Sequence, residues 1–335
     1  MKSDAYDDLD RALVHALQLD GRAPFSRIAE VLGVSDQTVA RRYTRLRTTG
    51  AIRVLGLVDP SAVGEVMWMV RVRCLPDAAL AVAEALARRQ DTSWVSMMSN
   101  GTEVVAMARA ESGWDSDQLL LGKLPRTPRV VGVSAHCVLH EFFGGPKGLV
   151  TKSGSLTAEQ AALLSPPAVE PPATEPREPL GADDRKLLEV LARDGRAPLA
   201  ELAAATGWSQ STVRRRLAAL RADGTLYFDV DYGRAVFGQG ITTALWLSVP
   251  PSELHATGQA LADHPEVAFA CATTGPNNLF ATVVCRDVPA LYAYLTTRVA
   301  ALPAVRHMET SPTIRKIKGP GPLLASPHNP PRRTP

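Results

Sequence analysis

The chain has 335 residues, 45% of them hydrophobic, which is enough for two to four domains with cores of their own. Its formal net charge of +3 is too small to indicate a nucleic-acid partner by itself. No apolar stretch is long enough to cross a bilayer, and the first ten residues lack the apolar run of a secretory signal, so we expect a cytoplasmic protein without membrane association. The four cysteines form no Cys-x-x-Cys, so we expect buried, reduced thiols at Cys74, Cys137, Cys271 and Cys285.

Residues 7–52 predict three short helices. Leucine at every fourth position lines one face of the first helix: Leu9, Leu13 and Leu17. Pro24 suits the start of the second helix and Gly33 its end. Ser35 is a good N-cap for the third helix, which stops at Gly50. The inward-facing positions of the last two helices are Ile28, Ala29, Leu32, Val39, Tyr43 and Leu46. Three short helices with a glycine turn before the third are typical of a helix-turn-helix.

The same pattern occurs a second time. Asp-Gly-Arg-Ala-Pro at residues 20–24 recurs at residues 194–198, which is 174 residues later, and the match extends both ways without a gap. Two copies at this distance indicate a domain duplication, because solenoid repeats have far shorter periods. The second helix-turn-helix is therefore predicted at residues 183–226.

The third helix of each copy carries arginines on the face opposite its apolar positions. Arginine suits bidentate contacts with guanine edges and with phosphate, and the helix after such a turn enters the major groove. A solvated basic helix is the alternative, but both copies keep Ser-x-x-Thr-Val-x-Arg-Arg, which favours DNA reading. The predicted DNA-binding residues are Ser35, Gln37, Thr38, Arg41, Arg42, Arg45, Ser209, Ser211, Thr212, Arg214, Arg215 and Arg216.

These motifs resemble the Lrp/AsnC, or feast/famine, family of transcription regulators. The resemblance is carried by Leu9-Asp10, by Asp-Gly-Arg at 20–22, by Ile-Ala-Glu-Val-Leu-Gly-Val-Ser at 28–35 and by Thr-Val-Ala-Arg-Arg at 38–42. The family unit occurs twice in tandem, and the two copies together cover nearly the whole chain. It implies a winged-helix-type head that binds double-stranded DNA, joined by a short strand to a ferredoxin-like domain that senses a small effector.

The segments after each helix-turn-helix fit that implication. Residues 53–59 predict the connecting strand, which Pro60 stops. The next elements are a strand at 66–74, a helix at 77–89, strands at 93–99 and 104–110, a helix at 114–124 and a strand at 130–139. The apolar face of the first of these helices is predicted to hold Leu80, Ala83, Leu86 and Ala87. The order βαββαβ is ferredoxin-like, and its uncovered sheet face favours pairing with a second such domain.

The second half repeats this order after a proline-rich linker. Within the linker, residues 157–164 predict a short helix capped by Thr157. The connecting strand is predicted at 227–231, strands at 241–249, 266–273, 279–285 and 305–315, and helices at 252–263 and 288–301. The predicted fold class is α+β, with two winged-helix/helix-turn-helix domains and two ferredoxin-like sensor domains in tandem. The predicted domains are 1–60, 61–143, the linker 144–182, 183–236, 237–318 and a disordered tail at 319–335.

The resemblance places effectors, often amino acids, near the loop between the second and third sensor strands. The usual Gly-x-Tyr-Asp is only partly kept, because both loops retain glycine but neither retains the aspartate. Glu103 replaces it in the first copy, whereas the second offers only neutral amides, and an ammonium group prefers a carboxylate partner. A bare turn rich in turn-forming residues remains the alternative. The candidate effector residues are Ser99, Asn100, Gly101, Thr102, Glu103, Thr274, Gly275, Pro276, Asn277 and Asn278.

No enzyme motif stands out: there is no P-loop, no Gly-x-Gly-x-x-Gly after a strand, no His-Glu-x-x-His and no Gly-x-Ser-x-Gly. His136 and His140 share one side of a strand but lack an evident third ligand, so no metal site and no cofactor are predicted. The alternative is an enzyme, because some tandem proteins similar to this family are sirohaem decarboxylases. Such an enzyme needs cationic and histidine groups, and the sensor halves offer Arg71, Arg73 and Arg109 without a histidine pair beside them.

Because both heads lie on one chain, we expect them to pair within it as a pseudo-dimer. Heads on separate chains would reach the same pairing only at higher concentration. The two reading helices differ at Asp36 and Gln210, at Ala40 and Arg214, and at Arg45 and Ala219. We therefore expect an imperfect palindrome with dissimilar half-sites. Further association of the fused chain into homo-oligomers is also expected.

Overall fold

The computed structural model describes residues 6–111, 129–166 and 180–323. Its contacts divide the chain into two compact units. Unit 1 combines the residues up to Val63 with Gly145–Gly238, and unit 2 combines Gly64–Gly144 with Gln239–Pro322. Each unit therefore takes one segment from each half of the internal repeat.

Unit 1 holds both helix-turn-helix domains, the strands that follow them and the start of the linker. We call α1–α3 the first head and α6–α8 the second head. The elements of unit 1 are α1 (Asp8–Leu19), α2 (Phe25–Leu32), α3 (Asp36–Thr48), β1 (Ile52–Val58), η1 (Pro60–Val63), η5 (Leu149–Lys152), α5 (Ala158–Leu164), α6 (Ala182–Arg193), α7 (Leu199–Thr206), α8 (Gln210–Ala222), β6 (Leu226–Tyr232) and η6 (Arg234–Phe237).

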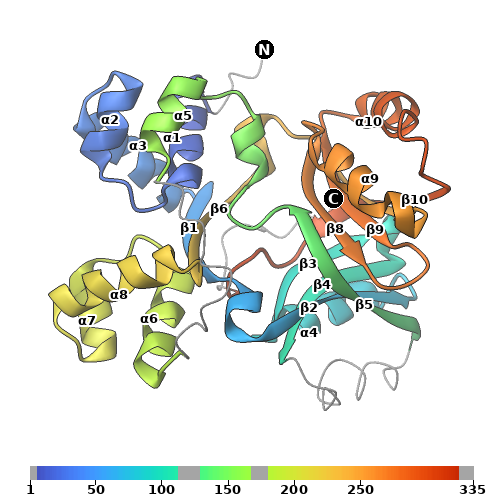
Figure 1. The fold of residues 1–335 in the computed structure, drawn as a ribbon, viewed down its shortest axis with the longest axis horizontal. Helices are drawn as coiled ribbons and strands as arrows, with labels where there is room; N and C mark the ends of the chain where they lie inside the picture. Colours follow the sequence, from blue (N-terminus) through green and yellow to red (C-terminus); the bar gives the residue numbers. More distant parts are fainter. Residues whose placement is uncertain (1–5, 112–128, 167–179, 324–335) are drawn as a thin grey trace, which may run out of the picture. The chain divides into compact units, whose positions relative to one another are not determined.

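The two connecting strands pair with each other. β1 and β6 form an antiparallel two-stranded sheet over seven residue pairs, and Figure 1 shows them side by side among the head helices. At the centre of the ladder Leu55 pairs with Asp229, its own counterpart 174 residues later. The two copies are thus related by a local twofold axis through this pair. The expected pairing of the two heads within one chain is present in unit 1.

The repeated Asp-Gly-Arg-Ala-Pro stretch forms the contact between the heads. Arg22 donates to the carbonyl oxygens of Gly195 at 2.8 Å and Ala197 at 3.1 Å, and Arg196 donates to those of Gly21 at 2.8 Å and Ala23 at 3.0 Å. The two glycines let the stretches pack closely on the β1–β6 sheet, because a Cβ on Gly195 would lie 2.7 Å from the Leu55 backbone and a Cβ on Gly21 would lie 2.7 Å from the Cβ of Phe228. The stretch that reveals the duplication in the sequence is therefore also the seam between its copies.

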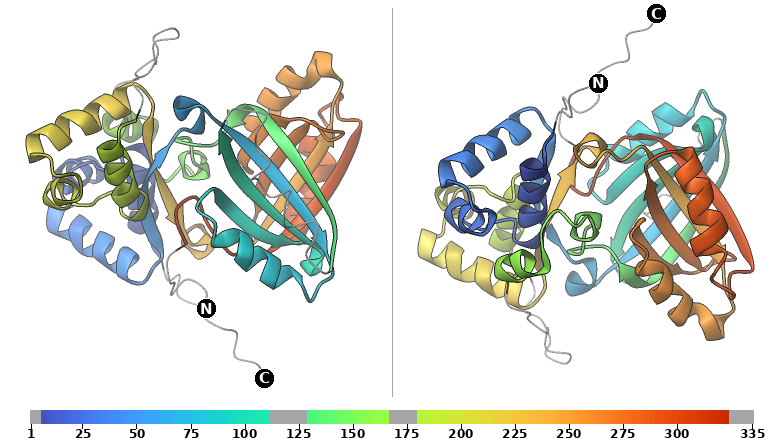
Figure 2. Two further views of the ribbon diagram at one scale, coloured as in Figure 1. Left: turned by 90° about the horizontal axis from the view of Figure 1, so that it is seen from below. Right: turned by 90° about the horizontal axis from the view of Figure 1, so that it is seen from above.

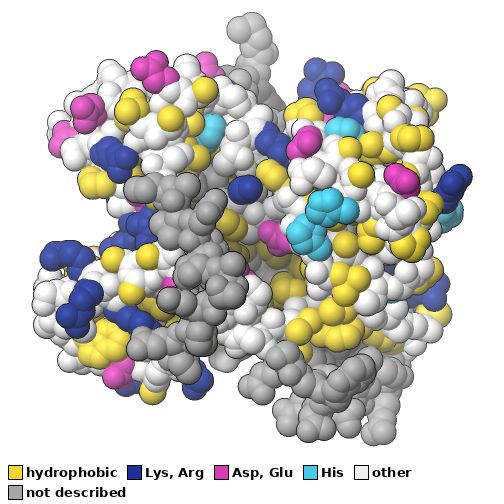
Figure 3. All heavy atoms as spheres, viewed as in Figure 1, with side chains coloured by type: hydrophobic (Ala, Val, Ile, Leu, Met, Phe, Trp, Pro, Cys, Tyr) yellow, Lys and Arg dark blue, Asp and Glu magenta, His cyan; other side chains and the backbone are white. Residues whose placement is uncertain are grey.

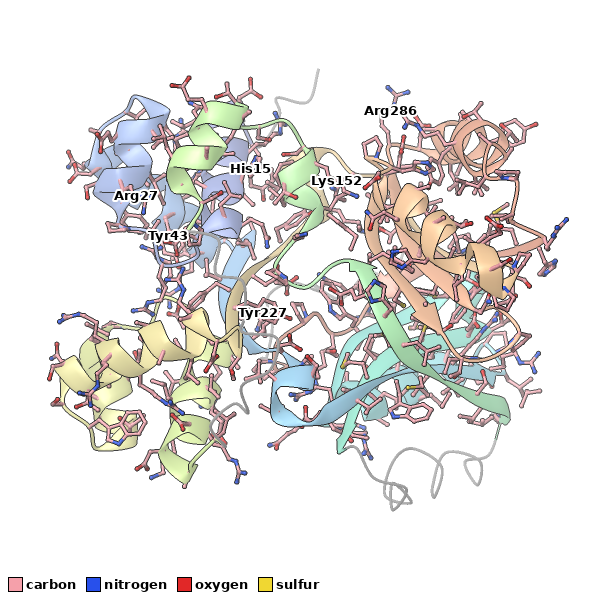
Figure 4. The ribbon with its side chains drawn as sticks, viewed as in Figure 1. His15, Arg27, Tyr43, Lys152, Tyr227 and Arg286 are labelled. Atoms are coloured by element: carbon pink, nitrogen blue, oxygen red, sulfur yellow. The ribbon has the colours of Figure 1, made fainter. Side chains whose placement is uncertain are left out.

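A second layer of ion pairs supports the seam. Arg47, at the end of α3, contacts Asp194 at 2.7 Å, and its counterpart Arg221 contacts Asp20 at 3.2 Å. Arg196 also lies over the rings of Phe25, at 4.4 Å, and Tyr43, at 5.4 Å, and Figure 4 marks Tyr43 where the heads meet. These crossed contacts orient α3 and α8 relative to each other.

The start of the linker packs on the first head. Helix α5 lies against α1 and α2, where Leu164 is fully buried and Gln160 donates to the Val31 carbonyl at 3.1 Å. Thr157 caps α5 as predicted, in a capping box with Gln160. Segment η5 covers α1, and Gln18 donates to the Pro146 carbonyl at 3.3 Å. The segment 146–164 is therefore a fixed strap on the first head.

Unit 2 contains the two predicted sensor domains. Its elements are β2 (Glu65–Cys74), α4 (Ala79–Ala87), β3 (Thr92–Met98), η2 (Ser99–Gly101), β4 (Glu103–Glu111), β5 (Val130–Phe143), β7 (Ile241–Ser248), η7 (Pro251–Glu253), α9 (Leu254–Ala262), β8 (Val267–Thr273), β9 (Leu279–Cys285), α10 (Val288–Tyr294), the π-turn η8 (Leu295–Val299) and β10 (His307–Lys316). The predicted helix at 114–124 lies outside the described residues.

The two sensor sheets join at both edges into one closed eight-stranded sheet, in the order β10-β3-β4-β2-β5-β8-β9-β7. The last strand of each half pairs with the second strand of the other, since β5 pairs with β8 and β10 pairs with β3. Figure 2 shows the strands curving round with the helices outside. The uncovered sheet faces thus cover each other, as the βαββαβ pattern predicts.

Three parts of the sequence prediction need correction. Leu80 does not belong to the buried face of α4, because it is 38% exposed while Val82, Ala83 and Leu86 pack on the sheet. The strand predicted at 130–139 continues to Phe143 as β5, since its end pairs with β8 of the other half. In the predicted tail, the Gly319 carbonyl accepts a hydrogen bond from Trp94, and residues 324–335 lie outside the described residues.

Candidate nucleic-acid interface

The third helices of the two heads, α3 and α8, begin with the same cap. Gly33 and Gly207 adopt left-handed conformations, with φ of +67° and +78°, and turn the chain between the second and third helices. Ser35 then accepts a hydrogen bond from the Thr38 amide, and Ser209 one from the Thr212 amide, both at 3.2 Å. Four of the predicted DNA-binding residues, Ser35, Thr38, Ser209 and Thr212, therefore form the N-terminal caps of α3 and α8.

The inner faces of α3 and α8 are apolar and buried. In α3 this face is Val39, Tyr43 and Leu46, and in α8 it is Val213, Leu217 and Leu220. This burial fixes which residues point outward. The exposed residues that the prediction included are Gln37, Arg41 and Arg45 on α3 and Ser211, Arg214 and Arg215 on α8.

One arginine in each helix is turned back into its own head. Arg42 contacts Asp7 at 2.7 Å and Asp10 at 2.9 Å, and its counterpart Arg216 contacts Asp184 at 2.7 Å. Asp10 and Asp184 are 1% and 5% exposed, so these ion pairs are largely removed from water. The hydrogen bond from Arg216 lowers the pKa of Asp184 below its usual value, despite the opposing effect of burial.

The remaining arginines divide into two groups. Arg45 contacts Asp10 at 2.5 Å but stays 46% exposed, and alanine occupies its place in α8. Arg41 and Arg215 are repeat counterparts, both are exposed, and neither forms an ion pair with any residue that the structure describes. Arg214 shares that state on α8 but has alanine as its counterpart on α3. Arg41 and Arg215 are therefore the arginine pair that both heads present to solvent.

Sequence reasoning missed the groups that position these helices. Asp10 and Asp184 hold Arg42 and Arg216, while Arg22 and Arg196 join the heads. Each of these side chains is matched by its own counterpart in the other copy, so a signal was present. An alignment of the two copies that marks every charged residue kept in both would have identified these acidic and basic residues together.

The first candidate effector loop is occupied by contacts within unit 2. Glu103 is 3% exposed, forms an ion pair with Arg71 and accepts a hydrogen bond from Ser311 at 3.0 Å. Arg71 also pairs with Glu309 and lies over the Trp246 ring at 4.7 Å. Asn100 has a φ of +58° in the tight turn η2, and the Thr102 hydroxyl donates to the Ser99 carbonyl. The buried Glu103 carboxylate already has a cationic partner.

The second loop is bound to its surroundings through backbone and amide groups. The Thr274 hydroxyl accepts from the Cys137 amide at 2.9 Å, and Gly275 lies so close to His136 that a Cβ would be 2.5 Å from Nδ1. Asn278 bridges the backbone of Val249, with contacts of 2.9 and 2.8 Å. The Asn277 carbonyl accepts from the Thr273 hydroxyl at 3.1 Å. The two loops are thus unlike, as the sequence indicates.

Three further findings concern metal binding, membrane spans and the cysteines. Among the residues described, no three or more His, Cys, Asp or Glu side chains come together in a way that would hold a metal ion. Within the same residues no helix has the length and apolar character needed to traverse a membrane. The four cysteines are unpaired, and three of them are buried.

The fold and the interface define a class of protein in which two helix-turn-helix heads and two ferredoxin-like domains follow one another on one chain. Sequence comparison agrees with this class. The AsnC-type helix-turn-helix domain matches residues 7–47 and 182–221, and the Lrp/AsnC ligand binding domain matches residues 242–323.

Two relatives illustrate the family. The chain is 30% identical over 120 residues to an uncharacterized HTH-type transcriptional regulator of Pyrococcus furiosus, covering 35% of this chain and 81% of that protein. It is 25% identical over 143 residues to the HTH-type transcriptional regulator FL11 of Pyrococcus horikoshii, covering 42% of this chain and 94% of that protein. The protein belongs to the Lrp/AsnC family.

One solved structure has a similar fold over nearly its whole length. The siroheme decarboxylase NirDL superimposes with a TM-score of 0.62 at 14% sequence identity, and the match covers 93% of both chains. At this identity the likeness concerns the fold alone, because one fold hosts many functions.

Proposed function

We propose that this protein is a sequence-specific DNA-binding transcription regulator whose two heads bind one duplex together. The observation that carries the proposal is the pair of capped helices α3 and α8. At the same position each presents an exposed arginine, Arg41 or Arg215, that forms no ion pair with a described residue. Family membership supports it, since the matched domain is a helix-turn-helix and the named relatives are transcriptional regulators. The twofold seam of unit 1 supplies the symmetry that two half-sites require.

In this proposal the predicted arginines have different roles. Arg41 and Arg215 contact base edges or phosphate, with Gln37 and Ser211 beside them. Arg42 and Arg216 orient the helices, because their guanidinium groups are held by buried carboxylates. Arg45 is a further contact of the first head alone, since its counterpart is Ala219.

The two half-sites should differ. Thr44, Arg45 and Thr48 of α3 are all replaced by alanine in α8, so polar groups are absent from that part of the second head. Alanine methyl groups suit contact with the methyl group of thymine, whereas arginine suits guanine. We therefore expect selection from random DNA to return an inverted repeat with dissimilar arms.

The test combines that selection with three variants. Arg41→Ala and Arg215→Ala should each weaken DNA binding, relax base preference in a different arm, and reduce the slope of log affinity against log salt concentration by about one. Arg286→Ala removes an exposed arginine of unit 2 and is the matched control, since it should leave DNA affinity unchanged. If the control and the head variants bind alike, the heads are not DNA readers.

Effector binding at the two loops remains a prediction, and the contacts of Glu103 restrict it. An amino-acid ammonium group at that carboxylate would have to compete with Arg71 and Ser311. A calorimetric titration with single amino acids, repeated on Glu103→Gln, tests this directly. Heat that persists unchanged in the variant would place any effector elsewhere.

An enzymatic function is the alternative to consider, because the fold shared with NirDL covers 93% of the chain. A macrocycle with many carboxylates requires several unpaired cations. Arg71, on the inner side of the closed sheet, is paired with two glutamates, and Trp246 beside it is only 1% exposed. We propose that the chain is not a decarboxylase. An absorbance titration showing tight sirohaem binding, together with release of CO₂, would reverse this.

A further inference from the structure

Two histidines of unit 2 meet at the junction of the two sensor halves. His140 lies on β5, the last strand of the first half, and His255 lies on α9, the first helix of the second half. Both side chains are exposed, and their ring centroids are 5.6 Å apart. Figure 3 shows a patch of histidine side chains on the surface of this unit. The pair is separated by 115 residues of sequence and arises only because the sheet closes.

A rigid platform holds the pair. The ring of Phe142 lies 4.7 Å from that of His140 and 5.7 Å from that of His255, so the three rings form a triangle. Phe142 fits a notch in α9 at Gly258, where a Cβ would come within 2.2 Å of its ring. His140 pairs with Ala272 of β8, on which α9 packs. Two imidazoles are therefore fixed on a strand and a helix rather than on loops.

The separation of the rings matches that of two imidazoles on one metal ion. A zinc–nitrogen bond of roughly 2.1 Å places the ring centre roughly 3.2 Å from the ion. When the nitrogen–metal–nitrogen angle lies between the tetrahedral and trigonal values, the centres of the two rings are about 5.2 to 5.6 Å apart. We propose that His140 and His255 form a binding site for a divalent transition-metal ion, with water completing its coordination.

The other described histidines do not offer this arrangement. His136 contacts the Thr274 carbonyl at 2.9 Å, His264 contacts the Tyr294 hydroxyl at 3.0 Å, and His15 is buried. His307, on β10, is exposed and has no ring contact with another described histidine. With two protein ligands, the remaining coordination positions of the metal ion are held by water, and the ion should exchange readily with solution. Its affinity should follow the order of imidazole-binding metals, with Cu²⁺ above Ni²⁺ and Zn²⁺, and Mg²⁺ excluded as an oxygen-seeking ion.

Calorimetric titration of the full-length protein, without a histidine tag, tests the proposal. We expect about one equivalent of Zn²⁺ or Ni²⁺ to bind, and no heat from Mg²⁺. His140→Ala and His255→Ala should each weaken metal binding by at least roughly tenfold. The affinity of the double variant should be less than roughly tenfold below that of either single variant. His307→Ala is the matched control and should bind like the parent protein.

A spectroscopic measurement separates coordination from loss of structure. Cu²⁺ bound to the parent protein should show electron paramagnetic resonance coupling to two imidazole nitrogens, and His255→Gln should reduce this to one. Circular dichroism of each variant confirms that the sheet is intact. Equal affinity in the parent protein and both histidine variants, or an equal loss in His307→Ala, would overturn the site.

Discussion

The ion pair between Asp184 and Arg216 offers the sharpest test of how the heads are built. Arg216 grips the carboxylate with two contacts of 2.7 and 2.9 Å, and Asp184 is 5% exposed. Arg216→Ala leaves that buried carboxylate with only the Gly181 amide as a described partner, which should cost about 3 kcal/mol. Asp184→Ala should cost less, about 2 kcal/mol, because water can reach the arginine.

The double variant should cost about 3 kcal/mol, since the second change removes a group that has already lost its partner. The coupling energy is then about 2 kcal/mol. Trp208 is the single tryptophan of unit 1, so fluorine labelling of the tryptophans gives one resonance that reports urea unfolding of this unit alone. Unit 2 unfolding is followed separately in the same sample.

The neighbouring variant Arg215→Ala is the matched comparison. Its side chain is exposed, so the free energy of unfolding should change by less than about 0.5 kcal/mol, while DNA affinity falls. The reasoning fails if Arg215→Ala and Arg216→Ala destabilise unit 1 equally, or if the cycle shows no coupling. In that case the arginine that faces inward would not hold the helix in place.

Three further changes probe other parts of the molecule. Leu164→Ala, in the strap, should destabilise unit 1 by about 3 kcal/mol, whereas its exposed neighbour Leu163→Ala should have little effect in the same urea experiment. Burial lowers the pKa of His15, so its contribution to stability is complete above pH 6.5 and is lost as pH falls through the lowered pKa; His15→Leu should flatten that loss. Burial lowers the pKa of Lys318 to about 8, so unit 2 should gain stability as pH rises from about 8 to 10, and Lys318→Met should abolish the gain.

Much of the fold was readable from local patterns. The leucine spacing, the glycine turns and the serine caps predicted all six head helices, because each signal acts within one turn or one cap. The β-rich segments likewise predicted the strands. The full length of β5 was missed because its last residues are strand only through pairing with β8, which lies more than a hundred residues away.

The candidate sites were less readable, since a sequence shows residue types but not their partners. Arg41 and Arg42 are adjacent and chemically identical, yet one faces solvent and the other contacts buried Asp10. Which of them turns inward depends on how α3 packs on α1. His140 had an apparent partner in His136, four residues away, whereas its spatial neighbour is His255. Closure of the sheet decides that pairing.

The interleaved course of the chain bears on how the protein is made. Unit 1 needs residues on both sides of the first sensor segment, and unit 2 needs residues on both sides of the second head. As the chain leaves the ribosome, α1–α3 are complete long before β6 exists to pair with β1. A single cut in the chain therefore cannot release either unit whole. During synthesis, the edge of β1 in the first half stays unpaired until the second half supplies β6.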